Sequence, residues 1–89
     1  MSFRRIEYFL SVAKHLNFTK AARECYVAQA AISQQIKQFE EELGFKLFNR
    51  GGASVSLTPA GEYFAKQCQA VLAQYNGAVK QARFLAEGK

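Results

Sequence analysis

Residues 28–38 carry amide, hydroxyl and basic side chains at helical spacing and contain no carboxylate. Gln can form paired hydrogen bonds with adenine, Ser can bond to several bases, and Lys attracts phosphate. A carboxylate here would repel phosphate, so its absence favours a polyanionic partner. A solvated polar helix face is the plain alternative. The pattern predicts a helix whose first half enters the major groove of duplex DNA.

Other reactive side chains are scarce. His15 is the single histidine and has no nearby cysteine or aspartate, which predicts a surface histidine. Cys25 and Cys68 lie 43 positions apart, without a second ligand at metal-binding spacing. We expect both to be reduced, small hydrophobic residues, with redox sensing as the alternative. The sequence therefore predicts no metal, no cofactor and no enzymatic activity.

Apolar residues recur every three or four positions and predict three helices in the first half of the chain. The first runs from Phe3 to about His15, and Asn17 or Thr19 can cap a short second one. A third spans about residues 28–43 and ends at Gly44. Its predicted inward face consists of Ile32, Ile36, Phe39 and Leu43.

The period changes from residue 46 onward. Segments 47–50 and 54–57 flank Gly51 and Gly52, which predicts a short β-hairpin over about residues 46–57. Thr58 and Pro59 then resemble a helix cap followed by a first-turn proline, opening a last helix to about Ala86. Gly61 and Gly77 are expected to weaken that helix locally.

Eighty-nine residues with 49% hydrophobic and 21% charged side chains predict one folded domain. Twelve Lys and Arg against seven Asp and Glu give a net charge of +5, again favouring a polyanion. Neither a signal peptide nor an apolar run of membrane-spanning length is visible, so a cytoplasmic location is expected. A short helix, a tight connection and a polar second helix together suggest a helix-turn-helix motif with the hairpin as a wing.

The ordered spacing of these segments closely resembles the LysR-type transcriptional regulators over residues 3 to about 85. The resemblance is carried by 18–22 (Phe-Thr-Lys-Ala-Ala), 27–36 (Val-Ala-Gln-Ala-Ala-Ile-Ser-Gln-Gln-Ile), Phe39-Glu40, Leu43-Gly44, Leu47-Phe48, Arg50, Leu57-Thr58 and Gly61.

This resemblance implies a mainly α, bacterial winged helix-turn-helix domain over residues 1–58, with the DNA-reading motif at about 18–37. Residues 59–89 would form a dimerising linker helix, and the ligand-sensing domain that family members normally add is absent from this chain. The implied function is sequence-specific binding of a dimer to an interrupted inverted-repeat operator. The residues expected to contact DNA are Asn17, Thr19, Lys20, Ala28, Gln29, Ala30, Ser33, Gln34, Lys37, Arg50 and Gly52.

Three departures from the family pattern change these expectations. Ala28 and Ala30 stand where Ser and Pro are usual, so the reading helix lacks a serine cap and a pre-set first turn. Gln34 replaces a common Arg, which should alter sequence preference. Segment 51–53 offers no basic residue for the minor groove, so Lys46 and Arg50 are left to grip phosphate.

Arg50 has a second interpretation. Glu40 lies ten residues earlier, at the end of the predicted reading helix. An ion pair between the two side chains is as reasonable as a DNA contact by Arg50, and the sequence leaves both open.

The last predicted helix has apolar residues that alternate spacings of four and three, a 3.5-residue repeat. A helix of about 40 Å exceeds what the small winged domain can cover, so a second chain is expected to cover the rest. Packing wholly within one chain is the alternative. The predicted dimer seam consists of Phe64, Cys68, Val71, Leu72, Tyr75, Ala78, Val79, Ala82 and Leu85.

A helical adaptor module whose basic face binds an acidic protein is the rival from another class. Such a module has no need to exclude carboxylates from residues 28–38, so the sequence favours DNA.

Overall fold

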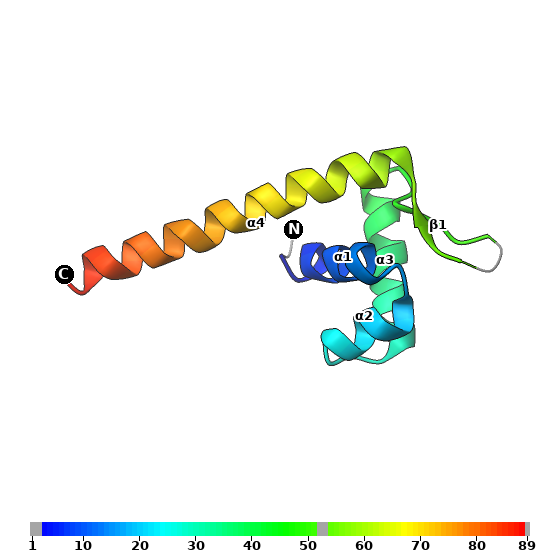
Figure 1. The fold of residues 1–89 in the computed structure, drawn as a ribbon, viewed down its shortest axis with the longest axis horizontal. Helices are drawn as coiled ribbons and strands as arrows, with labels where there is room; N and C mark the ends of the chain where they lie inside the picture. Colours follow the sequence, from blue (N-terminus) through cyan, green and yellow to red (C-terminus); the bar gives the residue numbers. More distant parts are fainter. Residues whose placement is uncertain (1–2, 52–53, 89) are drawn as a thin grey trace.

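The chain folds as three short helices, a two-stranded hairpin and one long helix (Figure 1). The computed structural model describes residues 3–51 and 54–88. The elements are α1 (Phe3–His15), α2 (Phe18–Glu24), α3 (Gln29–Leu43), β1 (Phe48–Asn49), β2 (Ser56–Leu57) and α4 (Pro59–Ala86). The mainly helical winged fold expected from the sequence is confirmed.

Local sequence explains where each helix begins and ends. Asn17 caps α2 by accepting a hydrogen bond from the Lys20 amide at 2.9 Å, which decides between the two candidate caps. α3 ends at Gly44, whose φ of 85° is the left-handed conformation that glycine adopts without strain. Thr58 caps α4 by accepting a hydrogen bond from the Gly61 amide at 2.9 Å.

The core lies where α1, α2 and α3 meet the first three turns of α4. Phe9 is fully buried, with its ring centroid 5.6 Å from Phe48, 5.7 Å from Phe64 and 6.4 Å from Phe39. On α3 the predicted inward face is confirmed, with only Leu43 part-exposed. These contacts fix α3 against the domain by one face and leave its other face to solvent.

The hairpin strands are shorter than the sequence predicts. They pair antiparallel only as Phe48 with Leu57 and Asn49 with Ser56. At the base of the hairpin the amides of Leu47 and Phe48 donate to the Glu40 carboxylate, which ties the start of β1 to α3.

α4 extends beyond the domain that its first turns help to build (Figure 1). Its 28 residues give the chain a longest dimension of 55 Å against 26 and 20 Å in the other directions. The radius of gyration is 15.0 Å, whereas a compact chain of this length would have about 12 Å. From 73 to 86 every residue except Val79 is exposed. None of the helices within 3–51 and 54–88 is both long and apolar enough to span a membrane.

Candidate nucleic-acid interface

α2 and α3 form a helix-turn-helix whose connection is a tight, fully hydrogen-bonded turn. The amide of Tyr26 donates to the Arg23 carbonyl at 3.2 Å, and that of Val27 donates to the Ala22 carbonyl at 3.0 Å. Ala21 and Ala22 are buried against the neighbouring helices, where small side chains permit close approach. The turn thereby holds the first turn of α3 at a fixed angle to α2.

The outward face of α3 carries the residues expected to read DNA. Ala28, Gln29, Ala30, Gln34 and Lys37 are exposed, and Ser33 is half-buried on the flank. Ala28 makes no side-chain cap, as its departure from the family pattern predicts. The backbone amides of Gln29 and Ala30 therefore have no side-chain acceptor from the cap residue and are available to an anionic ligand, whereas the Ala31 amide donates to the Ala28 carbonyl at 3.0 Å.

The four glutamines of α3 divide between two faces. Gln35 and Gln38 accept hydrogen bonds from Arg5 of α1, each at 3.2 Å, and Arg5 also forms a 2.6 Å ion pair with Glu42. Gln29 and Gln34 lie on the exposed face. Packing against α1 thus explains which amides are available for base recognition, a distinction that composition alone could not make.

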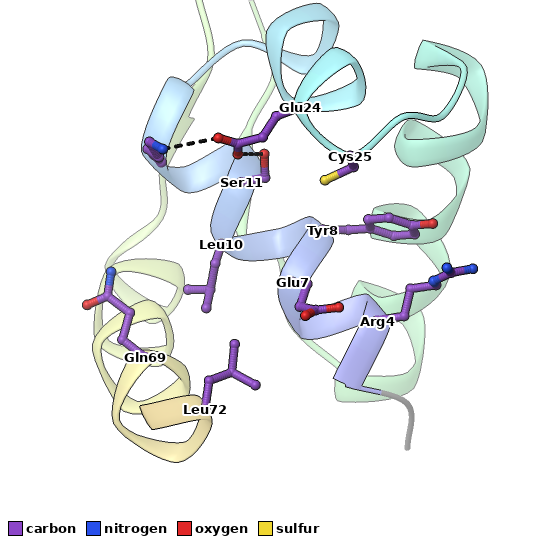
Figure 2. A pocket seen from close by; sticks show the side chains of 10 residues that line it. Arg4, Glu7, Tyr8, Leu10, Ser11, Glu24, Cys25, Gln69 and Leu72 are labelled. Carbon is purple, nitrogen blue, oxygen red and sulfur yellow. Dashed lines mark hydrogen bonds and ion pairs between the residues drawn. The ribbon is translucent and has the colours of Figure 1, made fainter. Parts of the chain in front are cut away.

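Glu24 is the one carboxylate between residues 17 and 39, and it is held against α1. Its oxygens accept hydrogen bonds from Ser11 Oγ at 2.6 Å and Lys14 Nζ at 3.1 Å, and Figure 2 shows it turned toward Ser11. The Ser11 hydrogen bond, followed by that of Lys14, lowers the pKa of Glu24 to about 2. Its negative charge is therefore engaged on the α1 side, at the edge of a groove of about 510 Å³.

The same cluster corrects the expectation for His15. Its side chain is only 25% exposed, and Nε2 lies 3.4 Å from Glu24 Oε1. His15 is therefore half-buried at the end of α1, beside the carboxylate of the last residue of α2.

Glu40 anchors the base of the wing. Its side chain is 2% exposed and accepts hydrogen bonds from the backbone amides of Leu47 at 2.7 Å and Phe48 at 3.2 Å. Arg50 approaches the same carboxylate at 3.3 Å, and its guanidinium lies 4.9 Å from the centroid of the Phe18 ring. Of the two interpretations left open for Arg50, the ion pair with Glu40 is present. The backbone contacts of Glu40 carry no sequence signal and were not predicted.

The remaining interface residues surround these elements. Asn17 uses its side-chain oxygen to cap α2, while Thr19 and Lys20 in the first turn are exposed. Lys46 is exposed beside the wing. Gly52, which the sequence placed among the DNA contacts, lies outside the described residues.

The predicted dimer seam is divided by the structure. Cys68 is 4% exposed within the chain's own core, and burial raises the pKa of its thiol. Phe64 packs its ring 6.0 Å from both Phe39 and Phe45, and Leu72 packs partly against the core. The expectation is corrected for Cys68, which its own domain encloses, whereas Phe64 and Leu72 stay part-exposed and remain predicted seam residues. The exposed remainder consists of Val71, Tyr75, Ala78, Ala82 and Leu85, with Val79 half-buried beside it.

Among the described residues, no group of three His, Cys, Asp or Glu side chains is placed to hold a metal ion. The surface around the start of α3 instead presents side-chain amides, a hydroxyl group, lysines and backbone amides at the helix N-terminus. The profile of the family described as "Bacterial regulatory helix-turn-helix protein, lysR family" matches residues 3–62. The chain belongs to the LysR family.

Curated LysR-type relatives are transcriptional regulators. The chain is 43% identical to the regulator AlsR of Bacillus subtilis over 89 residues, covering all of this chain and 30% of AlsR. It is 42% identical to BudR of Klebsiella aerogenes over 88 residues, 99% of this chain and 62% of BudR. The LysR-type chain described here thus spans only part of each relative's length.

Solved structures agree on the fold. A BenM DBD complex with catB site 1 DNA superposes with a TM-score of 0.96 at 36% identity, covering 99% of this chain and 95% of that one. A CbnR DBD–DNA complex gives a TM-score of 0.92 at 31% identity over 97% and 99% of the two chains. Residues 3–51 and 54–88 thus form a LysR-type helix-turn-helix DNA-binding domain.

Proposed function

We propose that this LysR-type domain binds duplex DNA as a homodimer on an interrupted inverted repeat, with the first half of each α3 in the major groove. The observation that carries the proposal is the separation of charges around α3. Gln29, Gln34 and Lys37 face solvent, while the nearest carboxylate on the preceding helix, Glu24, is bound to α1. Phosphate can approach this face without meeting an unpaired negative charge.

Within that arrangement the side chains divide into base readers and backbone contacts. Gln29, Gln34 and Ser33 present amides and a hydroxyl that suit base edges in the major groove. Lys20 and Lys37 supply positive charge to the phosphates on either side, with Thr19, Asn17 and the first-turn amides of α2 and α3. Arg50, held by Glu40, acts chiefly by positioning the wing.

The division of the chain at residue 58 is part of the proposal, with the first turns of α4 packing against the DNA-binding unit. Residues 1–58 would form the DNA-binding unit, and residues 59–89 the helix that joins two copies. BenM and CbnR supply DNA complexes of similar domains, which supports DNA as the partner of this chain. The proposed role is that of a non-catalytic transcription regulator. A helical adaptor that binds an acidic protein is the weaker alternative, because the DNA complexes are formed by similar domains.

The first prediction tests specific binding. Affinity for a site selected from random DNA should exceed affinity for a scrambled duplex, and both should fall steeply as salt rises, because bound lysines release counterions from phosphate. Fluorescence anisotropy between low and physiological salt measures both quantities. Equal affinity for the two duplexes at every salt concentration would contradict the proposal, and tight binding to an acidic protein instead would favour the adaptor.

The second prediction separates base reading from backbone contact. Gln29→Ala should cost about 1–3 kcal/mol on the selected site and relax one base position in each half-site. Lys20→Ala should weaken binding to all sequences alike and reduce the slope of log affinity against log salt by about one. Gln38→Ala is the matched control, since that amide is engaged by Arg5 and should leave base preference intact. An unchanged consensus for Gln29→Ala would remove Gln29 from the base readers.

A further inference from the structure

The turn between α2 and α3 contains a tyrosine where this turn geometry usually requires glycine. The two hydrogen bonds from Tyr26 and Val27 back to Arg23 and Ala22 form the paired pattern of a Schellman turn. The residue at its left-handed position is most often Gly, and here Tyr26 adopts a φ of 59°. A Cβ in this conformation crowds the backbone, so the local fold would be more stable with glycine.

Packing does not compensate for this strain. The Tyr26 side chain is 95% exposed, whereas its neighbours Cys25 and Val27 both pack partly against the core. An exposed aromatic ring on a strained backbone therefore stabilises nothing within the domain. Strained backbone that the fold does not need is typical of functional positions.

The position of Tyr26 along the chain indicates what the ring meets. It precedes Gln29 by three residues, which span at most about 11 Å even when extended. The major groove that α3 would enter is about 12 Å wide and bordered by phosphates. A residue that close to Gln29 therefore lies at the phosphate rim when the first turn of α3 is in the groove. Its charged neighbours are Arg23, which is exposed, and Glu24, whose carboxylate is paired with Ser11 and Lys14.

We propose that the Tyr26 hydroxyl donates a hydrogen bond to a DNA phosphate at the edge of the groove read by α3, fixing the angle at which the helix enters. The proposal rests on the proposed function and adds a contact outside the residues already assigned to it. A phenol suits this position because it can donate to a phosphate oxygen while its ring covers the adjoining sugar. It carries no charge, so it adds affinity without releasing a counterion.

Two substitutions test the contact, and the second should lower affinity while raising stability. Tyr26→Phe removes only the hydroxyl and should weaken binding about 5- to 20-fold on selected and scrambled DNA alike, with the salt slope unchanged. Tyr26→Gly should also weaken binding, yet raise the melting temperature by about 2–6 °C because the left-handed strain is relieved. Tyr63→Phe is the control, an exposed tyrosine of α4 whose hydroxyl loss should leave affinity unchanged.

The outcomes separate this proposal from the proposed function. Wild-type affinity for both Tyr26 variants, with specific binding intact, would overturn the phosphate contact and leave the function standing. If both Tyr26 variants bound DNA as the wild type does but no longer bound an acidic protein that the wild type binds, Tyr26 would belong to a protein-binding surface instead. A reduced salt slope for Tyr26→Phe would also overturn it, since a neutral donor releases no counterion.

Discussion

Gly61→Ala should lower the free energy of unfolding by about 2–4 kcal/mol, even though alanine is the better helix former. A Cβ at Gly61 would collide with the backbone carbonyl of Leu47. That peptide cannot move away easily, because its oxygen accepts from the Thr58 amide at 3.0 Å and the Leu47 amide donates to Glu40. The substitution must therefore displace the start of α4 or break these hydrogen bonds.

Gly77→Ala is the matched control within the same helix. A Cβ there meets nothing within 4 Å, so the change should raise the free energy of unfolding by about 0.5–1 kcal/mol through helix propensity alone. Urea unfolding followed by circular dichroism, at one protein concentration for all variants, measures both. Equal changes for the two glycines would show that the Gly61–Leu47 approach does not constrain the fold.

This pair of glycines illustrates what the sequence could not provide. Pattern alone predicts that both weaken α4, because propensity depends only on residue type and helical position. For Gly61 this predicts the wrong sign for a change to alanine, because the glycine permits its backbone to contact the backbone of Leu47. Leu47 lies 14 residues before Gly61, and no pattern in either segment predicts that the two backbones are in contact.

The elements themselves follow closely from local signals. Apolar periodicity, Asn17 or Thr19 as a cap, Gly44 as a terminator and the Thr58-Pro59 start predict all four helices to within one or two residues. These signals act over a few residues and depend little on tertiary context. The hairpin strands are shorter than predicted, and the buried Glu40 carboxylate that binds two amides at their base leaves no pattern in the sequence.

Residue types alone predict which segment faces DNA, and the contacts in the structure show which of its side chains are free to do so. The absence of carboxylates in 28–38 predicts that α3 faces DNA, and only packing shows that Arg5 engages Gln35 and Gln38. Glu24 would seem unfavourable beside phosphate until Ser11 and Lys14 are found to bind it. Hydrogen bonds between polar side chains far apart in the sequence produce no repeating pattern, so sequence analysis does not detect them.

Val71→Lys should shift the chain from dimer to monomer and lower affinity for a two-half-site operator by about 100-fold or more, because each half-site alone binds weakly. Val71 is 47% exposed at the point where the domain ceases to cover α4, and Tyr75, one turn further, is 50% exposed. The Tyr75 ring contacts Phe3 of α1 at 4.8 Å, so the proposed contact continues onto the N-terminal end of the domain. In a symmetric seam the substitution would bury two lysines without partners.

Ala73→Lys is the matched control, because it adds the same charge to the same helix about 160° around from Val71. It should remain dimeric and bind the operator as the wild type does, while sedimentation and helical circular dichroism are recorded for both variants. Val71→Lys should keep its helical signal, since the buried cluster around Phe9 does not include Val71. If Val71→Lys remained dimeric at micromolar concentration, the seam would lie on another face of α4. If it unfolded outright, Val71 would contribute to the domain core, and the exposed stripe that covers the second copy would begin further along the helix.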